Sequence, residues 1–148
     1  MSLHDKLAAE LKAAMLARDA DRLSTLRLLK SALGYAAIEK KLDALPDADF
    51  LAIVQKEIKK RRDSSEQFQA AGRAELATRE LAELTVLEEF LPTALTPAEL
   101  EALVKECIRE TGAASKKDMG PVIRAVQAKA GGRAEGKTIS QLVGRLLP

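Results

Sequence analysis

The sequence contains 148 residues with a formal net charge of +2, and its 47% hydrophobic and 31% charged residues argue against a disordered chain. No apolar run approaches the roughly 20 residues of a membrane-spanning helix, and the N-terminus lacks the basic and apolar regions of a secretory signal. We therefore expect no membrane contact. Because a single cysteine excludes an internal disulfide, we also expect a cytoplasmic location.

Four segments within residues 1–92 carry apolar side chains every three or four positions, the spacing of one face of an α-helix. They predict helices over about 3–18, 20–40, 48–71 and 74–90. Residues that start or stop helices separate them, namely Ser2, Asp19, Pro46 and Gly72. No segment alternates with a period of two, so strands are not expected.

Two prolines, Pro92 and Pro97, interrupt this pattern and indicate a domain boundary. Three shorter helical segments follow. Each is preceded by a residue that can cap a helix: Thr96, Ser115 and Thr138. We expect Gly120–Pro121 to delay or kink the start of the second segment. The prediction is therefore an all-α protein, with a four-helix N-terminal domain over residues 1–92 and a three-helix bundle tail domain over residues 93–148.

No residue pattern points to a catalytic centre. His4 lies in the first helical turn with no second histidine or cysteine nearby, and we expect it to be exposed to solvent rather than to bind a metal. Cys107 falls on the apolar face of its helix, which favours a small core residue over a nucleophile. The sequence has no phosphate-binding loop, dinucleotide fingerprint or metal-ligand spacing. We therefore predict no catalytic residue, no metal site and no cofactor.

A group of basic residues lies on the third predicted helix: Lys56, Lys59, Lys60, Arg61 and Arg62. Because consecutive helical positions point about 100° apart, these five charges spread over a broad arc. Two interpretations stay open. The group is either a solvated face whose aliphatic stems cover the core, or a secondary patch that binds phosphates or an acidic partner.

A second basic region lies in the tail. Residues 112–148 hold seven Lys and Arg against two Asp and Glu, a net charge of +5. Within them, the glycine-rich loop over residues 131–137 leads into a predicted helix N-terminus, where exposed N–H groups favour anions. The candidate RNA-binding residues are Lys116, Lys117, Arg133 and Lys137. The alternative is ordinary loop chemistry, in which the glycines end one helix and turn the chain into the next.

Six motifs occur in order along nearly the whole chain: Arg22–Lys30, Gln55–Ser64, Ala71–Arg73, Leu87–Pro92, Lys117–Gly120 and Gly132–Lys137. In this combination they resemble the YqeY family, whose proteins are related to the tail domain of the aspartyl/glutamyl-tRNA amidotransferase B subunit. Two positions depart from the family pattern. Glu135 stands where an aspartate is expected, and Pro121 stands where a longer polar residue is common.

The resemblance implies a helical domain followed by a three-helix module that, in the amidotransferase, helps to hold the tRNA. Family members are often labelled as carbon–nitrogen ligases with glutamine as the amide donor. This chain has neither the Ser-Ser-Lys arrangement of an amidase nor a nucleotide-binding element. We therefore expect a non-catalytic accessory protein that binds tRNA or another structured RNA. In the alternative, it is an adaptor that docks its basic face on an amidotransferase or aminoacyl-tRNA synthetase subunit.

Overall fold

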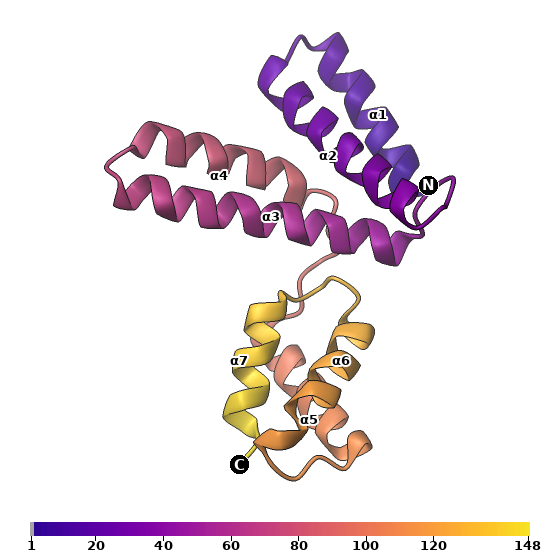
Figure 1. The fold of residues 1–148 in the computed structure, drawn as a ribbon, viewed down its shortest axis with the longest axis vertical. Coiled ribbons are helices and arrows are strands. Elements are labelled where there is room, and N and C mark those ends of the chain that lie inside the picture. Colours follow the sequence, from indigo (N-terminus) through magenta and orange to yellow (C-terminus); the bar gives the residue numbers. More distant parts are fainter. Residues whose placement is uncertain (1) are drawn as a thin grey trace. The chain divides into compact units, whose positions relative to one another are not determined.

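The structure is a computed structural model that describes residues 2–148. This range contains seven α-helices, one short 3-10 helix and no strand, so the all-α prediction is confirmed (Figure 1). The helices are α1 (Leu3–Leu16), α2 (Ala20–Glu39), α3 (Asp47–Ala70), α4 (Ala74–Glu88), α5 (Pro97–Thr111), η1 (Lys116–Asp118), α6 (Met119–Ala130) and α7 (Gly136–Leu146). None of the helices described here is long and apolar enough to cross a membrane.

The chain divides into two compact units, one ending at Leu91 and the other beginning at Pro92. In the first unit, α1 and α2 form one helical hairpin and α3 and α4 form another, and α2 contacts all three other helices (Figure 1). The fully buried side chains at the centre of this unit include Leu26, Phe50 and Leu87. They come from α2, from α3 and from the end of α4, so one core joins the two hairpins.

Two predicted caps of the first unit form as expected, at Ser2 and Asp19, whereas α3 begins at Asp47, directly after Pro46, without a side-chain cap. The Ser2 hydroxyl accepts from the N–H of Asp5 at 3.0 Å, and the Asp5 carboxylate accepts from the N–H of Ser2 at 3.2 Å. At the start of α2, the Asp19 carboxylate accepts from the N–H of Arg22 at 3.1 Å. Gly72 has a φ of 75°, the left-handed conformation that ends α3.

The second unit packs α6 against both α5 and α7. Its fully buried side chains are mostly valines and come from all three helices: Val104, Cys107, Val122, Val126, Ile139 and Val143. The Thr96 capping box forms, with the hydroxyl accepting from the N–H of Glu99 at 3.1 Å. Gly112 and Gly131 end α5 and α6 in the left-handed conformation.

Two details of the tail helices differ from expectation. Thr138 does not cap α7, because the helix begins two residues earlier at Gly136, after Glu135. Pro121 does not delay α6, which begins at Met119. The reason is that Pro121 is the third residue of that helix, where a backbone N–H would have no intrahelical partner to lose.

Candidate nucleic-acid interface

The four tail residues predicted to bind RNA fall into two separate pairs. Lys116 and Lys117 lie in η1, just before α6, whereas Arg133 and Lys137 lie beyond its C-terminal end. Because α6 has 12 residues, its ends are about 18 Å apart. The structure therefore does not bring the four side chains into one compact site.

Arg133 has a structural role inside the second unit. Its Nε donates to the carbonyl oxygen of Thr93 at 2.8 Å, and its own carbonyl oxygen accepts from the N–H of Leu95 at 2.9 Å. These bonds join the loop after α6 to the segment that precedes α5. Lys137, in the first turn of α7, is exposed. Of this pair, only Lys137 has a side chain that makes no such structural hydrogen bond in the described chain.

The other pair, Lys116 and Lys117, lies at the end of the unit where α7 finishes. The backbone N–H of Lys116 donates to the carbonyl oxygen of Pro148 at 3.1 Å. The Met119 methyl carbon lies 3.4 Å from where a Cβ atom on Gly144 would be, so the missing side chain of this glycine lets the two helices approach. Both contacts place the last turn of α7 beside the start of α6.

Two further arginines belong to this end of the second unit. Arg145 lies in the last turn of α7, next to Gly144. Arg124 reaches back one turn along α6, where its Nη1 lies 3.4 Å from the Cβ position of Gly120. We call this group the basic end and define it by four exposed residues: Lys116, Lys117, Arg124 and Arg145.

The basic end has no acidic partner among residues 2–148. Asp118, which follows Lys117 in the chain, uses its carboxylate to accept the N–H groups of Ala114 at 2.9 Å and Ser115 at 3.3 Å. Four positive charges at one end of a small unit form an attractive site for anions.

Ion pairs with lysines neutralise much of the negative charge on α5. Lys129 of α6 lies 2.7 Å from Glu110 and 3.3 Å from Glu106 of α5, and its hydrogen bond to Glu110 raises the pKa of the lysine. Lys105 pairs with Glu101 at 3.3 Å. The excess positive charge of the tail is therefore concentrated away from this helix, largely at the basic end.

The secondary patch on α3 is split by burial. Lys56, Lys59 and Lys60 are exposed. Arg61 is only 7% exposed and is held between two carboxylates, with Nη1 at 2.9 Å from Glu57 and Nε at 3.3 Å from Glu83 on α4. Arg61 therefore joins α3 to α4 and is not available to a phosphate.

The rest of this patch is also partly engaged. Lys60 lies 3.5 Å from Glu57, and Arg62 is half-buried and has an interaction partner. The two fully available charges of the patch are Lys56 and Lys59, which are exposed and have no ion pair in the described chain.

His4 and Cys107, the two residues considered for catalysis, both have surroundings that indicate a structural role. His4 is half-buried rather than exposed, because its Nε2 forms a hydrogen bond of 2.9 Å with the carbonyl oxygen of Leu45 and its ring packs edge-on against Phe50. Cys107 is fully buried, which confirms its interpretation as a core residue, and burial raises the pKa of its thiol. Over residues 2–148, no group of three or more His, Cys, Asp and Glu is placed to hold a metal ion.

Comparison with known proteins places this geometry in a family. The family described as Yqey-like protein matches residues 4–147. The chain belongs to the YqeY family. It is 31% identical to a protein of Pyrenophora tritici-repentis named altered inheritance of mitochondria protein 41, mitochondrial, over 94% of this chain and 80% of that protein. It is 38% identical to an uncharacterised protein of Schizosaccharomyces pombe over 53% of this chain, and the match spans 63% of the length of that relative.

Proposed function

We propose that this YqeY protein is a non-catalytic accessory protein that binds tRNA or another structured RNA through its basic end. In this proposal, residues 93–148 act as a tail domain that follows a four-helix N-terminal domain over residues 1–92. The observation that carries the proposal is the gathering of Lys116, Lys117 and Arg124 with Arg145, all exposed and without acidic partners in the described structure. Arg and Lys side chains of this kind bind phosphate oxygens.

The recognition would depend on the RNA backbone and its shape. The four aromatic residues of the chain are Tyr35, Phe50, Phe68 and Phe90, so the sequence from residue 93 onward offers no ring on which a base could stack. Binding through phosphates is largely independent of sequence, as in proteins that recognise double-stranded RNA by its geometry. A structured RNA such as tRNA fits this chemistry better than an unpaired strand.

The link to tRNA amidation rests on the family. The amidotransferase B subunit has a similar tail, so an RNA presented to a glutamine-dependent carbon–nitrogen ligase is the ligand that we propose. We propose a cytoplasmic location from the single thiol, and the mitochondrial name of one relative makes localisation worth measuring.

Salt-dependent binding of the full-length protein to tRNA tests the proposal. We expect the double variant Lys116→Ala/Lys117→Ala and the double variant Arg124→Ala/Arg145→Ala each to lower affinity. Each should also reduce the slope of log K against log salt by about one for every phosphate that the variant no longer binds. Different RNA sequences should be affected about equally.

The matched control is Lys56→Ala/Lys59→Ala, which removes two exposed charges from the first unit. We expect it to change affinity little. If this control abolished tRNA binding while the variants at the basic end bound normally, the interface would lie on α3. If the wild-type protein bound no tRNA at low salt, the adaptor function would replace RNA binding.

A second measurement tests the non-catalytic part of the proposal. Purified protein supplied with glutamine, ATP, magnesium and misacylated tRNA should form no more amidated product than a blank. Product that persists after contaminating amidotransferase has been removed would show that the chain is an enzyme.

A further inference from the structure

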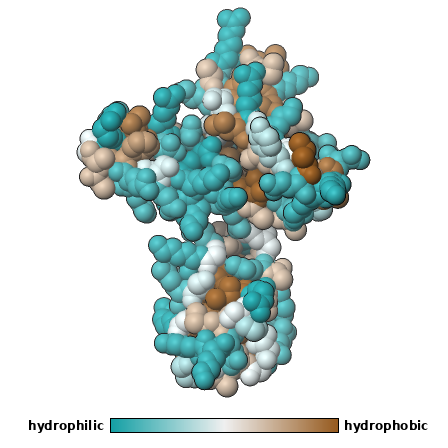
Figure 2. Space-filling view, viewed as in Figure 1, coloured by the Kyte–Doolittle hydropathy of each residue, from teal (hydrophilic) through white to brown (hydrophobic). Residues whose placement is uncertain are grey.

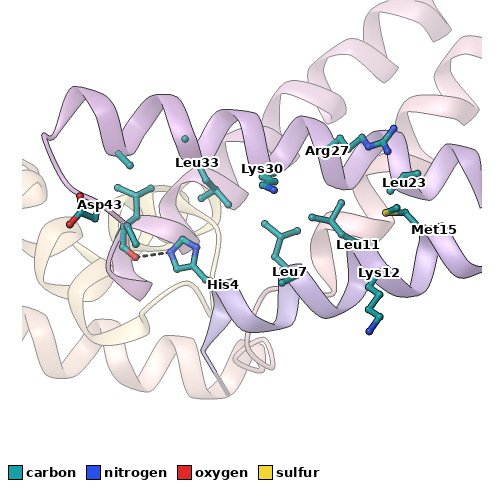
Figure 3. Close-up of a pocket in the computed structure, with 15 residues that line it drawn as sticks. His4, Leu7, Leu11, Lys12, Met15, Leu23, Arg27, Lys30, Leu33 and Asp43 are labelled. Carbon is teal, nitrogen blue, oxygen red and sulfur yellow. Dashed lines mark hydrogen bonds between the residues drawn. The ribbon is translucent and has the colours of Figure 1, made fainter.

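The first unit contains a groove between α1 and α2 that its own side chains leave unfilled. The groove has a volume of about 660 Å³ and an apolar floor built by both helices (Figure 3). The floor consists mainly of Leu7, Leu11, Leu23 and Leu33. One edge is open to solvent, since Met15 lines the groove and is 57% exposed. Figure 2 shows apolar surface interrupting the hydrophilic surface over this hairpin.

A glycine in the C-terminal half of α2 keeps part of the groove open. A Cβ atom on Gly34 would meet no heavy atom within 4 Å, so the packing of this unit does not require glycine there. Glycine in a helix interior is less stable than alanine. Ala8 and Ala37 line the same groove with short side chains. The chain thus leaves room at a position where a larger residue would fit and would stabilise the helix.

The rim of the groove is positively charged on both sides. Lys12 comes from the outer side of α1, with its side chain extending away from the floor, and Arg27 and Lys30 come from α2 (Figure 3). All three side chains are exposed and have no ion pair within the part of the chain that the structure describes. The one acidic residue in the lining, Asp43, lies at the end of the groove nearest His4 (Figure 3).

The length of the floor suits a helix. Along α1 the lining extends from His4 to Met15, and along α2 from Leu23 to Ala37, which correspond to about 16 Å and about 21 Å of helix. A ligand helix of three or four turns has the same length. Its apolar face would insert at positions i, i+3, i+4 and i+7, as in other helix-in-groove complexes.

From the apolar floor, the open glycine and the cationic rim, we propose that the α1–α2 groove binds an amphipathic helix of a partner protein whose apolar face is flanked by Asp and Glu. The leucines of the floor bury the apolar stripe. Lys12 on one side and Arg27 and Lys30 on the other pair with the acidic flanks. This site is separate from the basic end and does not depend on RNA binding.

A designed peptide serves as the probe. It carries leucines at helical i, i+3, i+4 and i+7 spacing with glutamates on both flanks, and a second peptide has lysines in place of the glutamates. Fluorescence anisotropy with the full-length protein should show saturable binding of the acidic peptide, and binding of the basic peptide weaker by about tenfold or more. Amide NMR shifts should map to Ala8, Gly34 and Ala37.

Gly34→Leu is the decisive variant, because the Cβ position of Gly34 is open, so a leucine there would occupy part of the groove, and it replaces a poor helix former. We expect it to keep or raise the melting temperature of the protein and to weaken binding of the acidic peptide by about tenfold or more. The control Gly34→Ala adds only a methyl group and should retain most of the affinity. The double variant Arg27→Glu/Lys30→Glu should weaken binding of the acidic peptide. The double variant Lys56→Glu/Lys59→Glu, which makes the same change of charge on α3, should leave that binding unchanged.

Any of the following outcomes would overturn the proposal. Equal binding of the acidic and basic peptides would show that the cationic rim does not select a partner with acidic flanks. Peptide binding that is unchanged in Gly34→Leu, or shifts confined to the second unit, would place the peptide elsewhere. If oleate below its micelle concentration, or a second copy of the chain in sedimentation measurements, occupied the groove while the acidic peptide did not, the occupant would be a lipid anion or the protein itself.

Discussion

The Nε atom of Arg133 donates a hydrogen bond of 2.8 Å to the carbonyl oxygen of Thr93. Together with the bond from the N–H of Leu95 to the carbonyl oxygen of Arg133, this contact fixes the segment that leads into α5. A side chain whose sequence context indicated a phosphate ligand thus has a role in organising the tail unit.

Replacing Arg133 by alanine should therefore affect stability more than RNA binding. We expect Arg133→Ala to lower the free energy of unfolding of the tail by about 1 kcal/mol, the usual contribution of one hydrogen bond, with tRNA affinity close to wild type. Denaturant unfolding followed through tail resonances measures the first quantity. Lys137→Ala is the control, since it removes an exposed charge from the same loop region. If the Arg133→Ala protein were stable but no longer bound tRNA, Arg133 would belong to the RNA-binding interface.

The helices of the tail could be predicted from sequence because their signals are local, such as the capping box at Thr96 and the left-handed glycine at Gly112. The basic end could not. Arg124 and Arg145 are 21 positions apart in the sequence, and they belong to the same end of the unit because the last turn of α7 packs beside the start of α6, where the Met119 side chain lies 3.4 Å from the Cβ position of Gly144. That contact is a property of tertiary packing and leaves no periodic signal.

The ion pairs of Arg22 should make the first unit less stable at low pH. Arg22 lies 2.7 Å from both Glu89 and Glu10, and its hydrogen bond holds the pKa of Glu89 below the ordinary value of 4.5. A carboxylate with a lowered pKa in the folded state contributes stability above its unfolded pKa and loses it as the pH falls through the folded pKa. Because these groups are partly exposed, we expect Arg22→Gln to cost only about 1 kcal/mol at pH 7.

The difference between wild type and Arg22→Gln should shrink as the pH falls below 4.5, and it should also shrink in high salt. Denaturant unfolding at several pH values measures it. Arg79→Gln, an exposed arginine of α4 without an ion pair in the described structure, is the control for the lost charge. A gap that stayed constant from neutral to acidic pH would show that Arg22 acts through packing alone.

Cys107 should react with thiol reagents only when the tail opens. Its side chain is fully buried and burial raises the pKa of the thiol, so little reactive thiolate is present in the folded state. We expect modification by a disulfide reagent to be slow in native buffer and fast in denaturant. Cys107→Ala should lower stability by about 1 kcal/mol and leave tRNA binding unchanged. Rapid stoichiometric labelling of the folded protein would contradict this.

The buried position of Arg61 was readable from the sequence, although the charge run around it concealed the signal. Phe50, Val54, Ile58 and Arg61 are spaced by four, four and three residues, so the arginine continues the apolar stripe of α3. What the sequence could not supply was the partner on another helix, Glu83. His4 illustrates the same limit, because its hydrogen-bond acceptor, the carbonyl oxygen of Leu45, comes from a distant loop.

Removing the Arg61 guanidinium should destabilise the first unit strongly. Its Nη1 donates to Glu57, and its Nε lies 3.3 Å from Glu83 without hydrogen-bond geometry, so charge attraction links Arg61 to α4. Arg61→Ala would leave two poorly solvated carboxylates facing each other, and we expect it to cost about 3 kcal/mol. Lys59→Ala on the exposed face should change stability by no more than about 0.5 kcal/mol.

A compensated variant distinguishes charge from packing. Arg61→Met combined with Glu57→Gln and Glu83→Gln removes all three charges while keeping side-chain volume, because apolar replacements of buried ion pairs are often neutral. We expect it to recover most of the stability that Arg61→Ala removes, as measured by denaturant midpoint and slope. Arg61→Met alone should remain destabilised, since it keeps both carboxylates. If the single and triple methionine variants were equally stable, the two glutamates would be solvated well enough to need no partner, and Arg61 would contribute to the α3–α4 contact through its aliphatic stem.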